Sequence, residues 1–588
     1  MKYALNNTSE TAGEKKISLW KGIKKLSPLV DGEQTSLLTA LVSVLINSGL
    51  TIAAPILVGH AVDNYIVTRR YHGVIVYSAI LLAIYAGMLI SGFIQTRIMG
   101  GVGQRILFRL RGKLFDRIQG LPVAFFNQNK AGDLISRINN DTDKLNQFFS
   151  RSLVQFVGNI FIIIGAGIAM LVVNHRLGIG ALLPALGLLV LTRLTSAWIK
   201  RKNKHSLQTL GALSGEIQES LENFRVIVAF NRRNYFRERF IEVNEKNYSA
   251  AIWAGIANNT YVPIFGFVSN LGTLIVITYG LTLISRGELT IGIMISYLAY
   301  VSRFYDPLRQ MASIWSDLQT ALAAWERISQ ILEMKSNLVI IEDKTERDES
   351  KLMSFHNVNF SYETGKNILK DVSFELEQSK IYALVGPTGG GKSTTASLMA
   401  RLYDPTTGKV LLHGKDIRSF TPDELASKIG FILQDPFLFS GTVRDNIVYG
   451  NEKYQKIKSK DLAAVLEEEG LSTLLERFDQ GLDTKVSASA SSISLGQKQL
   501  IAFIRAVLRH PELIILDEAT ANIDTITEKL LDDILGSLPK ATTIVVIAHR
   551  LNTIESADQI LFINDGLITP AGSLKDAISM LEHNARNS

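Results

Sequence analysis

The chain contains no cysteine, which excludes disulfide bonds and thiolate metal sites. This absence does not indicate a compartment, so the location has to come from other features. Residues 1–36 are polar and rich in lysine, and they lack the continuous apolar core of a secretory signal. We therefore expect no cleaved signal peptide in this segment.

Patterns typical of nucleic-acid binding are also missing. The formal net charge is +7 and the calculated isoelectric point is about 9.1, but the basic residues are not interleaved with aromatic ones as in proteins that bind strands. Membrane proteins keep Lys and Arg in their cytoplasmic loops, which accounts for the excess as well. We expect no nucleic-acid partner.

Length and hydropathy indicate at least two domains of different character. The 588 residues are too many for one compact core. Apolar residues make up 47% of the chain and the mean hydropathy is +0.17. These values are high for a soluble protein and low for one embedded wholly in lipid. A chain of which about half lies in a membrane fits both values.

Long uncharged runs predict where the chain crosses the membrane. Residues 34–62 carry no charged side chain, and this run is long enough to span a bilayer. The later runs are residues 74–96, 152–174, 177–192 with an extension at 194–199, a segment within 251–285, and a weaker sixth run from Leu289. Arg303 and Asp306 interrupt the sixth, and Pro307 is expected to kink or end it. We expect an all-α domain with six transmembrane helices.

The distribution of basic residues orients these spans. Lys and Arg are concentrated before the first span and after the second and fourth, whereas the turns at 175–176 and 286–288 are short and nearly free of charge. The positive-inside rule then places both ends of the chain in the cytoplasm. The expected location is the cytoplasmic (inner) membrane.

Two cytoplasmic stretches between the spans are much longer than ordinary loops. In the first, Ile106, Leu110, Leu114 and Ile118 recur at helical spacing. This pattern predicts that the membrane helices continue into the cytoplasm as amphipathic rods.

Breaks in the helical pattern predict a docking element in each of these stretches. The first lies around Phe125 and Phe126, and the second is expected near residues 216–224. Polar residues in or near the last two spans either line a pathway or hydrogen-bond to neighbouring helices. They are Asn258, Asn259, Asn270, Arg303 and Asp306.

The pattern changes after a charged stretch that has no apolar period. Beyond it, short apolar runs alternate with helical segments, as in an α/β core. We expect a cytoplasmic N-terminal segment (1–33), a transmembrane domain (34–334), a linker (335–352) and an α/β domain (353–588).

The α/β domain contains the P-loop pattern G-x-x-x-x-G-K-S. An apolar run at 381–385 predicts a buried parallel strand before it, and residues 396–401 predict a helix after it. The glycines turn N–H groups toward phosphate oxygens, and the helix, which is expected to begin near Lys392, adds its positive end. Lys392 should reach the β- and γ-phosphates of ATP, and Ser393 should ligate Mg²⁺. The candidate residues are Gly386, Pro387, Thr388, Gly389, Gly390, Gly391, Lys392, Ser393 and Thr394.

Side chains at the ends of other predicted strands add to this site. The apolar run 513–517 ends in Asp517 and is followed by Glu518. Asp517 should hold Mg²⁺, and Glu518 can orient or deprotonate the attacking water. Each further candidate also has an ordinary structural interpretation when it is taken alone. These candidates are Tyr362, Gln434 and His549.

Taken together, these residues closely resemble the ATPase of ABC transporters. Six spans with long cytoplasmic rods ahead of it resemble the exporter-fold half-transporters of that superfamily, and the resemblance covers nearly the whole chain from the first span. The matching residues are Tyr362, Gly386 to Ser393, Gln434, Ser494-Leu-Gly-Gln497, Asp517, Glu518, Asp524 and His549. The resemblance implies that Tyr362 stacks on adenine, that Gln434 senses Mg²⁺ and nucleotide, that Glu518 is the catalytic base, that Asp524 is the D-loop acid, and that His549 contacts the γ-phosphate.

The resemblance also implies that two such ATPases close head to tail around two ATP molecules. The signature residues Ser494, Gly496 and Gln497 would then face the P-loop of the partner. They are expected to precede a helix at 498–508, whose N-terminus can meet a phosphate.

This signature departs from the family pattern. The usual L-S-G-G-Q reads Ile493-Ser-Leu-Gly-Gln497, and residues 486–492 replace a stretch that usually contains Gly and Glu. The site on this chain's own P-loop looks competent, whereas the site it completes for a partner looks impaired. This asymmetry resembles the glutamate-bearing half of heterodimeric bacterial multidrug exporters. A homodimer that tolerates Leu495 stays open as the alternative.

We therefore expect an ATP-driven exporter of amphipathic drugs or lipids that uses ATP and Mg²⁺ and works with a second half-transporter. One alternative is an exporter-fold importer of siderophore-like cargo. Another is an ATP-gated membrane regulator with little turnover, against which the intact Glu518 argues. The sequence does not specify the cargo or the partner.

Overall fold

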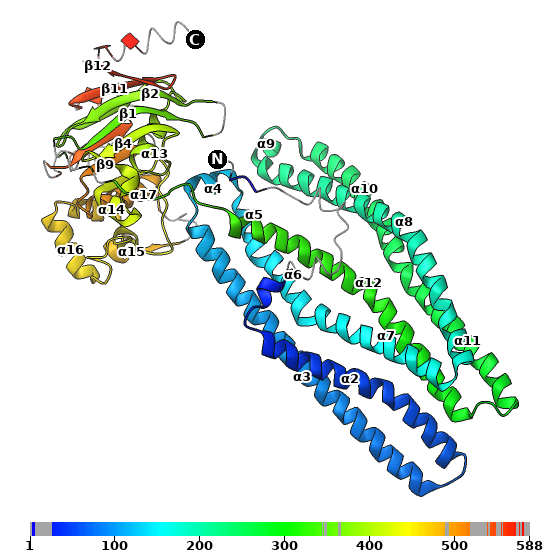
Figure 1. Cartoon of the computed structure of the whole chain (residues 1–588). Coiled ribbons are helices and arrows are strands. Elements are labelled where there is room, and N and C mark those ends of the chain that lie inside the picture. Colours follow the sequence, from blue (N-terminus) through cyan, green and yellow to red (C-terminus); the bar gives the residue numbers. More distant parts are fainter. Residues whose placement is uncertain are drawn as a thin grey trace. The chain divides into compact units, whose positions relative to one another are not determined.

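The computed structural model divides into two compact units. It describes residues 3–5, 26–343, 345, 348, 350–362, 366–487, 493–517, 535, 538, 541–547, 554–555, 557–571, 575–576 and 579–580. The helical unit comprises Asn7–Ile118 and Gly132–Glu333, and the sheet unit comprises Met1–Asn6, Gln119–Ala131 and Met334–Ser588. Figure 1 shows both units.

The helical unit is built mainly from long helices. The long helices are α2 (Gln34–Ala61), α3 (Tyr71–Gln119), α7 (Leu153–Val173), α8 (His175–Glu222), α10 (Arg233–Asn259), α11 (Tyr261–Ser285) and α12 (Ile291–Glu333). Short helices between them are α5 (Ala131–Ser136), α6 (Thr142–Gln147) and α9 (Phe224–Ala229). One-turn π-helical segments join some of them, at Val62–Ile66, Arg137–Asp141 and Phe148–Ser152. Helix α8 packs along α10 and α11, as Figure 1 also shows.

Within the described residues, five helical stretches are long and apolar enough to cross a membrane. They contain α2, α3, α7, α8 and α11. Helix α12 does not reach this level, because Arg303 and Asp306 interrupt its apolar run. It nevertheless continues as one helix through Pro307 to Glu333. The expected end of the helix at Pro307 was wrong, whereas a kink at Pro307 and a sixth span along α12 remain predictions.

The predicted cytoplasmic rods are continuous with the membrane helices. Helix α3 runs to Gln119 without a break, and Ile106, Leu110, Leu114 and Ile118 are all buried along one face. The amphipathic pattern that predicted this rod is therefore confirmed.

The second break lies at Asn223, within the predicted range 216–224. Helix α8 continues through Glu216 to Glu222, and the short helix α9 follows Asn223. Glu216 is buried and forms an ion pair with Arg239 Nε at 2.9 Å, which fastens α8 to α10. Further along the same pair of helices, Asn203 and Asn258 exchange side-chain hydrogen bonds of 2.8 and 2.9 Å. Asn258 therefore makes a helix–helix contact, one of its two predicted roles.

The sheet unit contains a six-stranded sheet and a four-stranded one. The larger has the order β12-β11-β3-β10-β9-β6, and the smaller antiparallel sheet has the order β2-β1-β4-β5. The strands are β1 (Met353–Phe360), β2 (Leu369–Leu376), β3 (Ile381–Val385), β4 (Thr407–Leu412), β5 (Lys415–Asp416), β6 (Ile429–Ile432), β9 (Leu513–Asp517), β10 (Thr543–Ile547), β11 (Gln559–Asn564) and β12 (Leu567–Ala571). Strands β11, β3, β10, β9 and β6 are parallel, so their carboxyl ends share one edge. The expected α/β fold is confirmed.

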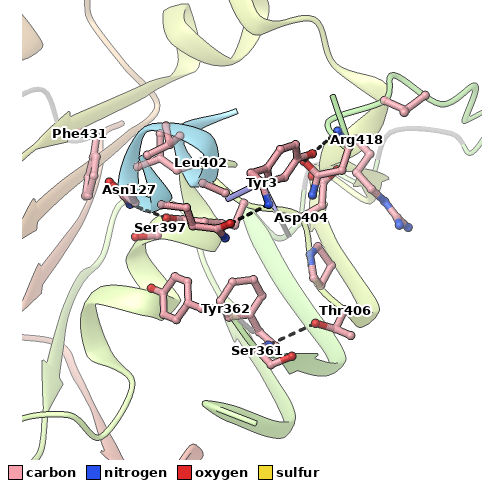
Figure 2. A pocket seen from close by; sticks show the side chains of 18 of the residues that line it. Tyr3, Asn127, Ser361, Tyr362, Ser397, Leu402, Asp404, Thr406, Arg418 and Phe431 are labelled. Atoms are coloured by element: carbon pink, nitrogen blue, oxygen red, sulfur yellow. Dashed lines mark hydrogen bonds between the residues drawn. The ribbon is translucent and has the colours of Figure 1, made fainter. Parts of the chain in front are cut away.

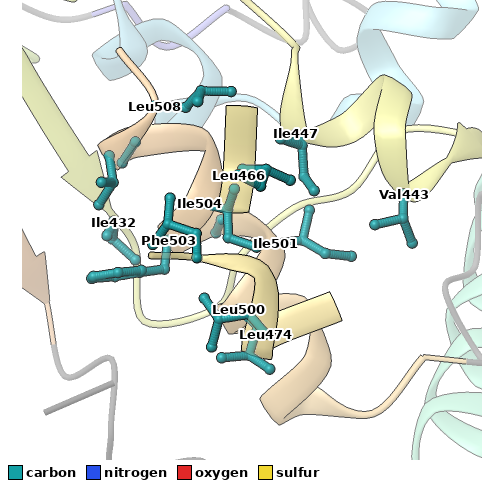
Figure 3. Close-up of a cluster of buried hydrophobic side chains, with 14 of the residues drawn as sticks. Ile432, Val443, Ile447, Leu466, Leu474, Leu500, Ile501, Phe503, Ile504 and Leu508 are labelled. Atoms are coloured by element: carbon teal, nitrogen blue, oxygen red, sulfur yellow. The ribbon is translucent and has the colours of Figure 1, made fainter. Parts of the chain in front are cut away.

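Helices and a short hairpin complete the sheet unit. The helices are α4 (Val123–Gln128), α13 (Lys392–Met399), α14 (Pro422–Lys428), α15 (Val443–Ile447), α16 (Ser459–Glu468) and α17 (Leu495–Val507), and the hairpin pairs β7 (Gly441–Thr442) with β8 (Lys485–Val486). Figure 3 shows Leu500, Ile501, Phe503 and Ile504 of α17 in one apolar cluster with residues of β6, α15 and α16. This cluster fixes α17 in the sheet unit.

A buried ionic cluster joins the segment after α5 to α12 in the helical unit. Arg137 has no exposed side-chain surface, and its Nε donates to Asp133 Oδ2 at 2.8 Å. Arg327 of α12 contacts Asp133 at 2.6 Å and the fully buried Asp141 at 3.3 Å. The two arginines and two aspartates neutralise one another, which burial of charge requires.

Replacing Arg137 by Ala should lower the free energy of unfolding by about 3 kcal/mol, because Asp133 would lose a buried partner. Thermal denaturation of the purified protein in detergent measures the change. Lys246→Ala is the matched control, since Lys246 forms an i,i+4 pair with Glu242 in which both side chains are about two thirds exposed. The control should change stability by less than about 0.5 kcal/mol. Equal effects of the two substitutions would contradict the prediction.

Candidate functional site

The P-loop lies between strand β3 and helix α13. Strand β3 spans the predicted residues, and its neighbours in the sheet are β11 and β10. Helix α13 begins at Lys392, as predicted, and its last residue is Met399, two residues before the predicted end at Arg401. Arg401 has a φ of 49°, a left-handed conformation that cannot continue a helix. The loop therefore ends at the amino end of α13, where N–H groups are free of intrahelical partners.

Two glycines of this loop occupy positions that no other residue fits. A Cβ atom on Gly386 would lie 1.9 Å from the carbonyl oxygen of Ile563, and its φ is 147°. Gly391 caps α13 with a φ of 118°. The two glycines thus hold the loop close to β11 at the edge of the sheet. A loop of this shape, with its N–H groups at the start of a helix, fits a phosphate group.

The predicted lysine and serine lie at the start of α13. Lys392 is almost fully buried, and its Nζ donates to the carbonyl oxygens of Gly386 and Pro387 at 2.8 and 3.0 Å. Ser393 Oγ donates to Asp517 Oδ1 at 3.2 Å. The structure thus brings together a hydroxyl and a carboxylate from distant segments, and Mg²⁺ in nucleotide sites typically takes one or two such oxygens together with phosphate.

Gln434 belongs to the same edge of the sheet. Strand β6 ends at Ile432 and pairs in parallel with β9, with Ile432 opposite Leu516. Gln434 therefore follows β6 beside the end of β9, where Asp517 lies. No group of three or more His, Cys, Asp or Glu side chains suited to a metal occurs among the described residues.

Tyr362 belongs to an aromatic cluster beside the P-loop. Its ring packs edge-on against Phe360 and Tyr403, with centroids 4.9 and 5.1 Å away. Its hydroxyl lies 3.0 Å from Thr394 Oγ1 in α13. Burial raises the pKa of Tyr362, so the phenol is neutral at physiological pH. The ring is 40% exposed, which leaves part of it available for a ligand.

A cavity of about 1060 Å³ extends from this cluster to helix α4 (Figure 2). Tyr362, Phe431 and Asp517 line it together with Val123 and Asn127 of α4. Asn127 Nδ2 donates to the hydroxyl of Tyr403 at 2.7 Å. The predicted docking element around Phe125 is therefore helix α4, which lies within the sheet unit. Sequence reasoning missed Asn127 and Tyr403; an aromatic residue shortly after the P-loop helix was the available signal.

The signature segment forms the first turn of α17, which starts at Leu495 and not at residue 498 as predicted. Ser494 is the N-cap: its Oγ accepts from Gln497 N at 3.2 Å, and Gln497 Oε1 accepts from Ser494 N at 2.9 Å. This reciprocal capping box explains the earlier start. Gly496 is buried inside the first turn, and Leu495 is half-buried at its first position.

The remaining predicted residues have no structural account. Glu518, Asp524, His549 and residues 488–492 lie outside the described residues. Thr388 and Gly389 lie in the described P-loop, and Gly390 N donates to Pro387 O at 3.1 Å.

Comparison with known proteins covers both units. Residues 37–308 match the family described as the ABC transporter transmembrane region, and residues 369–521 match the family described as ABC transporter. The uncharacterized ABC transporter ATP-binding protein YfiC of Bacillus subtilis is 33% identical over 92% of this chain and 89% of its own length. The fatty acid ABC transporter ATP-binding/permease protein of Mycobacterium tuberculosis is 32% identical, over 84% of this chain and 78% of its own. The multidrug resistance ABC transporter ATP-binding and permease protein of Lactococcus lactis is 31% identical, over 85% and 84%.

Substituting Ala for Gly386 should weaken ATP binding at least about tenfold, since the new Cβ would collide with Ile563 O and displace the loop. Binding of a fluorescent ATP analogue to the purified protein measures this. Gly470→Ala is the matched control, because Gly470 also has a positive φ of 71° but has no atom within 4 Å of the added Cβ. An unchanged affinity in Gly386→Ala would show that the loop does not hold the nucleotide.

Proposed function

Because this chain belongs to the ABC transporter family, as an exporter-fold half-transporter, we propose that it exports amphipathic drugs or lipids as one half of a heterodimer. ATP binding and ATP hydrolysis coupled to transport follow from its ATPase domain. Its apolar helices make it a membrane protein. The cytoplasmic membrane, with the ATPase domain on the cytoplasmic side, is part of the proposal.

The hydrogen bond between Ser393 and Asp517 is the observation that carries the proposal. In it, the P-loop hydroxyl and the β9 carboxylate lie 3.2 Å apart, so they are the two residues that would hold Mg²⁺. We assign the phosphate contacts to Lys392 and the loop N–H groups, and adenine stacking to Tyr362. Mg²⁺ bound between this pair and the phosphates would neutralise charge on the transferred group.

The assignment of catalysis rests on sequence alone. Glu518 directly follows Asp517, so it would stand at the end of β9 next to the Mg²⁺ site. It is the residue that would deprotonate or orient the attacking water, with Gln434 and His549 contacting Mg²⁺ and the γ-phosphate. ATP binding would close the ATPase pair, and hydrolysis would reset it.

The cargo proposal follows the names of relatives. Two of them are named for multidrug resistance and for fatty acids, which are both amphipathic or apolar classes. The described residues of the helical unit support no finer choice of cargo.

A heterodimer is favoured by the position of Leu495. The family's glycine at this place lets the backbone approach a phosphate, whereas Leu495 puts a four-carbon side chain on the first residue of α17. The chain would thus complete its partner's site poorly, while its own P-loop would be completed by a partner with an intact signature. Such a partner restores one working site for each dimer.

The first experiment is to measure ATP hydrolysis and particle mass for the chain purified alone in lipid nanodiscs. We expect little turnover, and we expect Leu495→Gly to raise it at least about tenfold by opening the signature to phosphate. Glu518→Gln added to that variant should abolish the gain. Leu567→Gly is the control, because Leu567 is an exposed leucine of the same unit. The heterodimer proposal would be wrong if the unmodified chain formed a dimer with Glu518-dependent ATP hydrolysis and Leu495→Gly did not change the rate.

A further inference from the structure

Residues 3–5, here termed the N-terminal strap, are fastened within the sheet unit. The side chain of Tyr3 is only 2% exposed and lines the cavity shared by α4 and the aromatic cluster. Figure 2 shows Tyr3 close to the α4 ribbon. A strap this deeply buried has specific partners, and they come from two segments far apart in the chain.

The first partner segment is the end of helix α4. Tyr3 N donates to Gln128 Oε1 at 2.7 Å, and Leu5 N donates to Asn129 Oδ1 at 2.9 Å. Asn129 Nδ2 donates to Tyr3 O at 2.9 Å and to Phe125 O at 2.7 Å. The amide of Asn129 therefore binds the backbone of the strap on both sides and also caps α4.

The second partner segment is the linker that follows α12. The Tyr3 hydroxyl donates to Asn337 Oδ1 at 2.7 Å and accepts from Asn337 N at 2.8 Å. Burial raises the pKa of Tyr3, so the hydroxyl keeps its proton at physiological pH and remains a donor. Two hydrogen bonds thus tie one phenol to one linker residue.

These two segments are the places where the chain passes between its units. Helix α4 lies in the insert Gln119–Ala131, which leaves and rejoins the helical unit, and Asn337 lies just after Met334, where the chain enters the sheet unit for the last time. Asn127 of α4 also binds Tyr403 of the sheet unit. Through Tyr3, the docking helix and the linker are therefore joined to each other as well as to the ATPase.

We propose that Tyr3 is a positioning residue that locks docking helix α4 to the linker, so that both follow the ATPase together during the transport cycle. This rests on the proposed export function. Without the lock, α4 would be held to the sheet unit by fewer hydrogen bonds. Motion of the ATPase would then be transmitted through the linker but less through α4. ATP hydrolysis would continue while less cargo moved for each ATP.

The first readout is the position of α4. The chain has no cysteine, so spin labels attach only at the exposed residues exchanged in Lys130→Cys and Asp423→Cys. Tyr3→Phe removes only the hydroxyl, and we expect it to broaden the distribution of distances between the two labels. Tyr71→Phe, at a tyrosine that is 78% exposed, is the control and should leave the distribution unchanged.

The second readout is the amount of ethidium transported for each ATP hydrolysed in proteoliposomes, with every variant made in the Leu495→Gly chain, which is expected to turn over ATP without another partner. Tyr3→Phe and Asn337→Ala should each lower this ratio about three- to tenfold, as expected for loss of one or two hydrogen bonds, with ATP hydrolysis changed less than about twofold. The double variant should be no worse than either single one. Asn337→Asp keeps the acceptor and should retain the ratio.

The outcomes separate this inference from the proposed function. An unchanged label distribution in Tyr3→Phe overturns the lock, and so does a broadened distribution with an unchanged transport ratio. A parallel fall of hydrolysis, transport and melting temperature would make Tyr3 a stabilising residue only, which also overturns it. If the Leu495→Gly chain hydrolyses ATP but moves no ethidium, export of this cargo class fails, and the label distribution still decides whether Tyr3 holds α4.

Discussion

The hydrogen bond from Ser393 to Asp517 joins two segments that lie 124 residues apart, and the candidate nucleotide site depends on it. The order of the strands makes this bond possible. Strands β3 and β9 both pair in parallel with β10, so the P-loop and Asp517 leave the sheet at the same edge. Nearly all side chains of these strands are buried, so the hydrophobic effect stabilises this sheet. The order of the strands in the sheet then fixes the geometry of the site.

Signals confined to a short stretch of sequence predicted most of the fold. The apolar run 381–385 is strand β3, and the run ending in Asp517 is β9, because strands buried on both faces are apolar at every position. The spacing of Ile106 and Leu110 predicted the rod of α3 for the same kind of reason. The start of α17 at Leu495 was also within reach, since Ser494 and Gln497 have the spacing of a capping box.

Contacts between distant segments carry no such signal. Asn127 and Tyr403, Arg137 and Arg327, and Tyr3 and Asn337 each meet only after the chain has folded. Nothing in the neighbouring sequence distinguishes these residues from other polar or aromatic residues of the chain. Pro307 predicted the end of a helix that in fact continues. Packing of α12 against α7 and α2 holds the helix together through a residue that weakens it locally.

The lengths of the helices bear on how the two units communicate. Helices α3 and α8 contain 49 and 48 residues, so each is a rod of roughly 70 Å that transmits a displacement which a loop would absorb. The short helices α4 and α9 follow these rods, and α4 is attached to the sheet unit by the hydrogen bond from Asn127 to Tyr403. Phe224, Val226 and Phe230, in and next to α9, are more than half exposed. Exposed apolar side chains gathered on one short helix are typical of an interface.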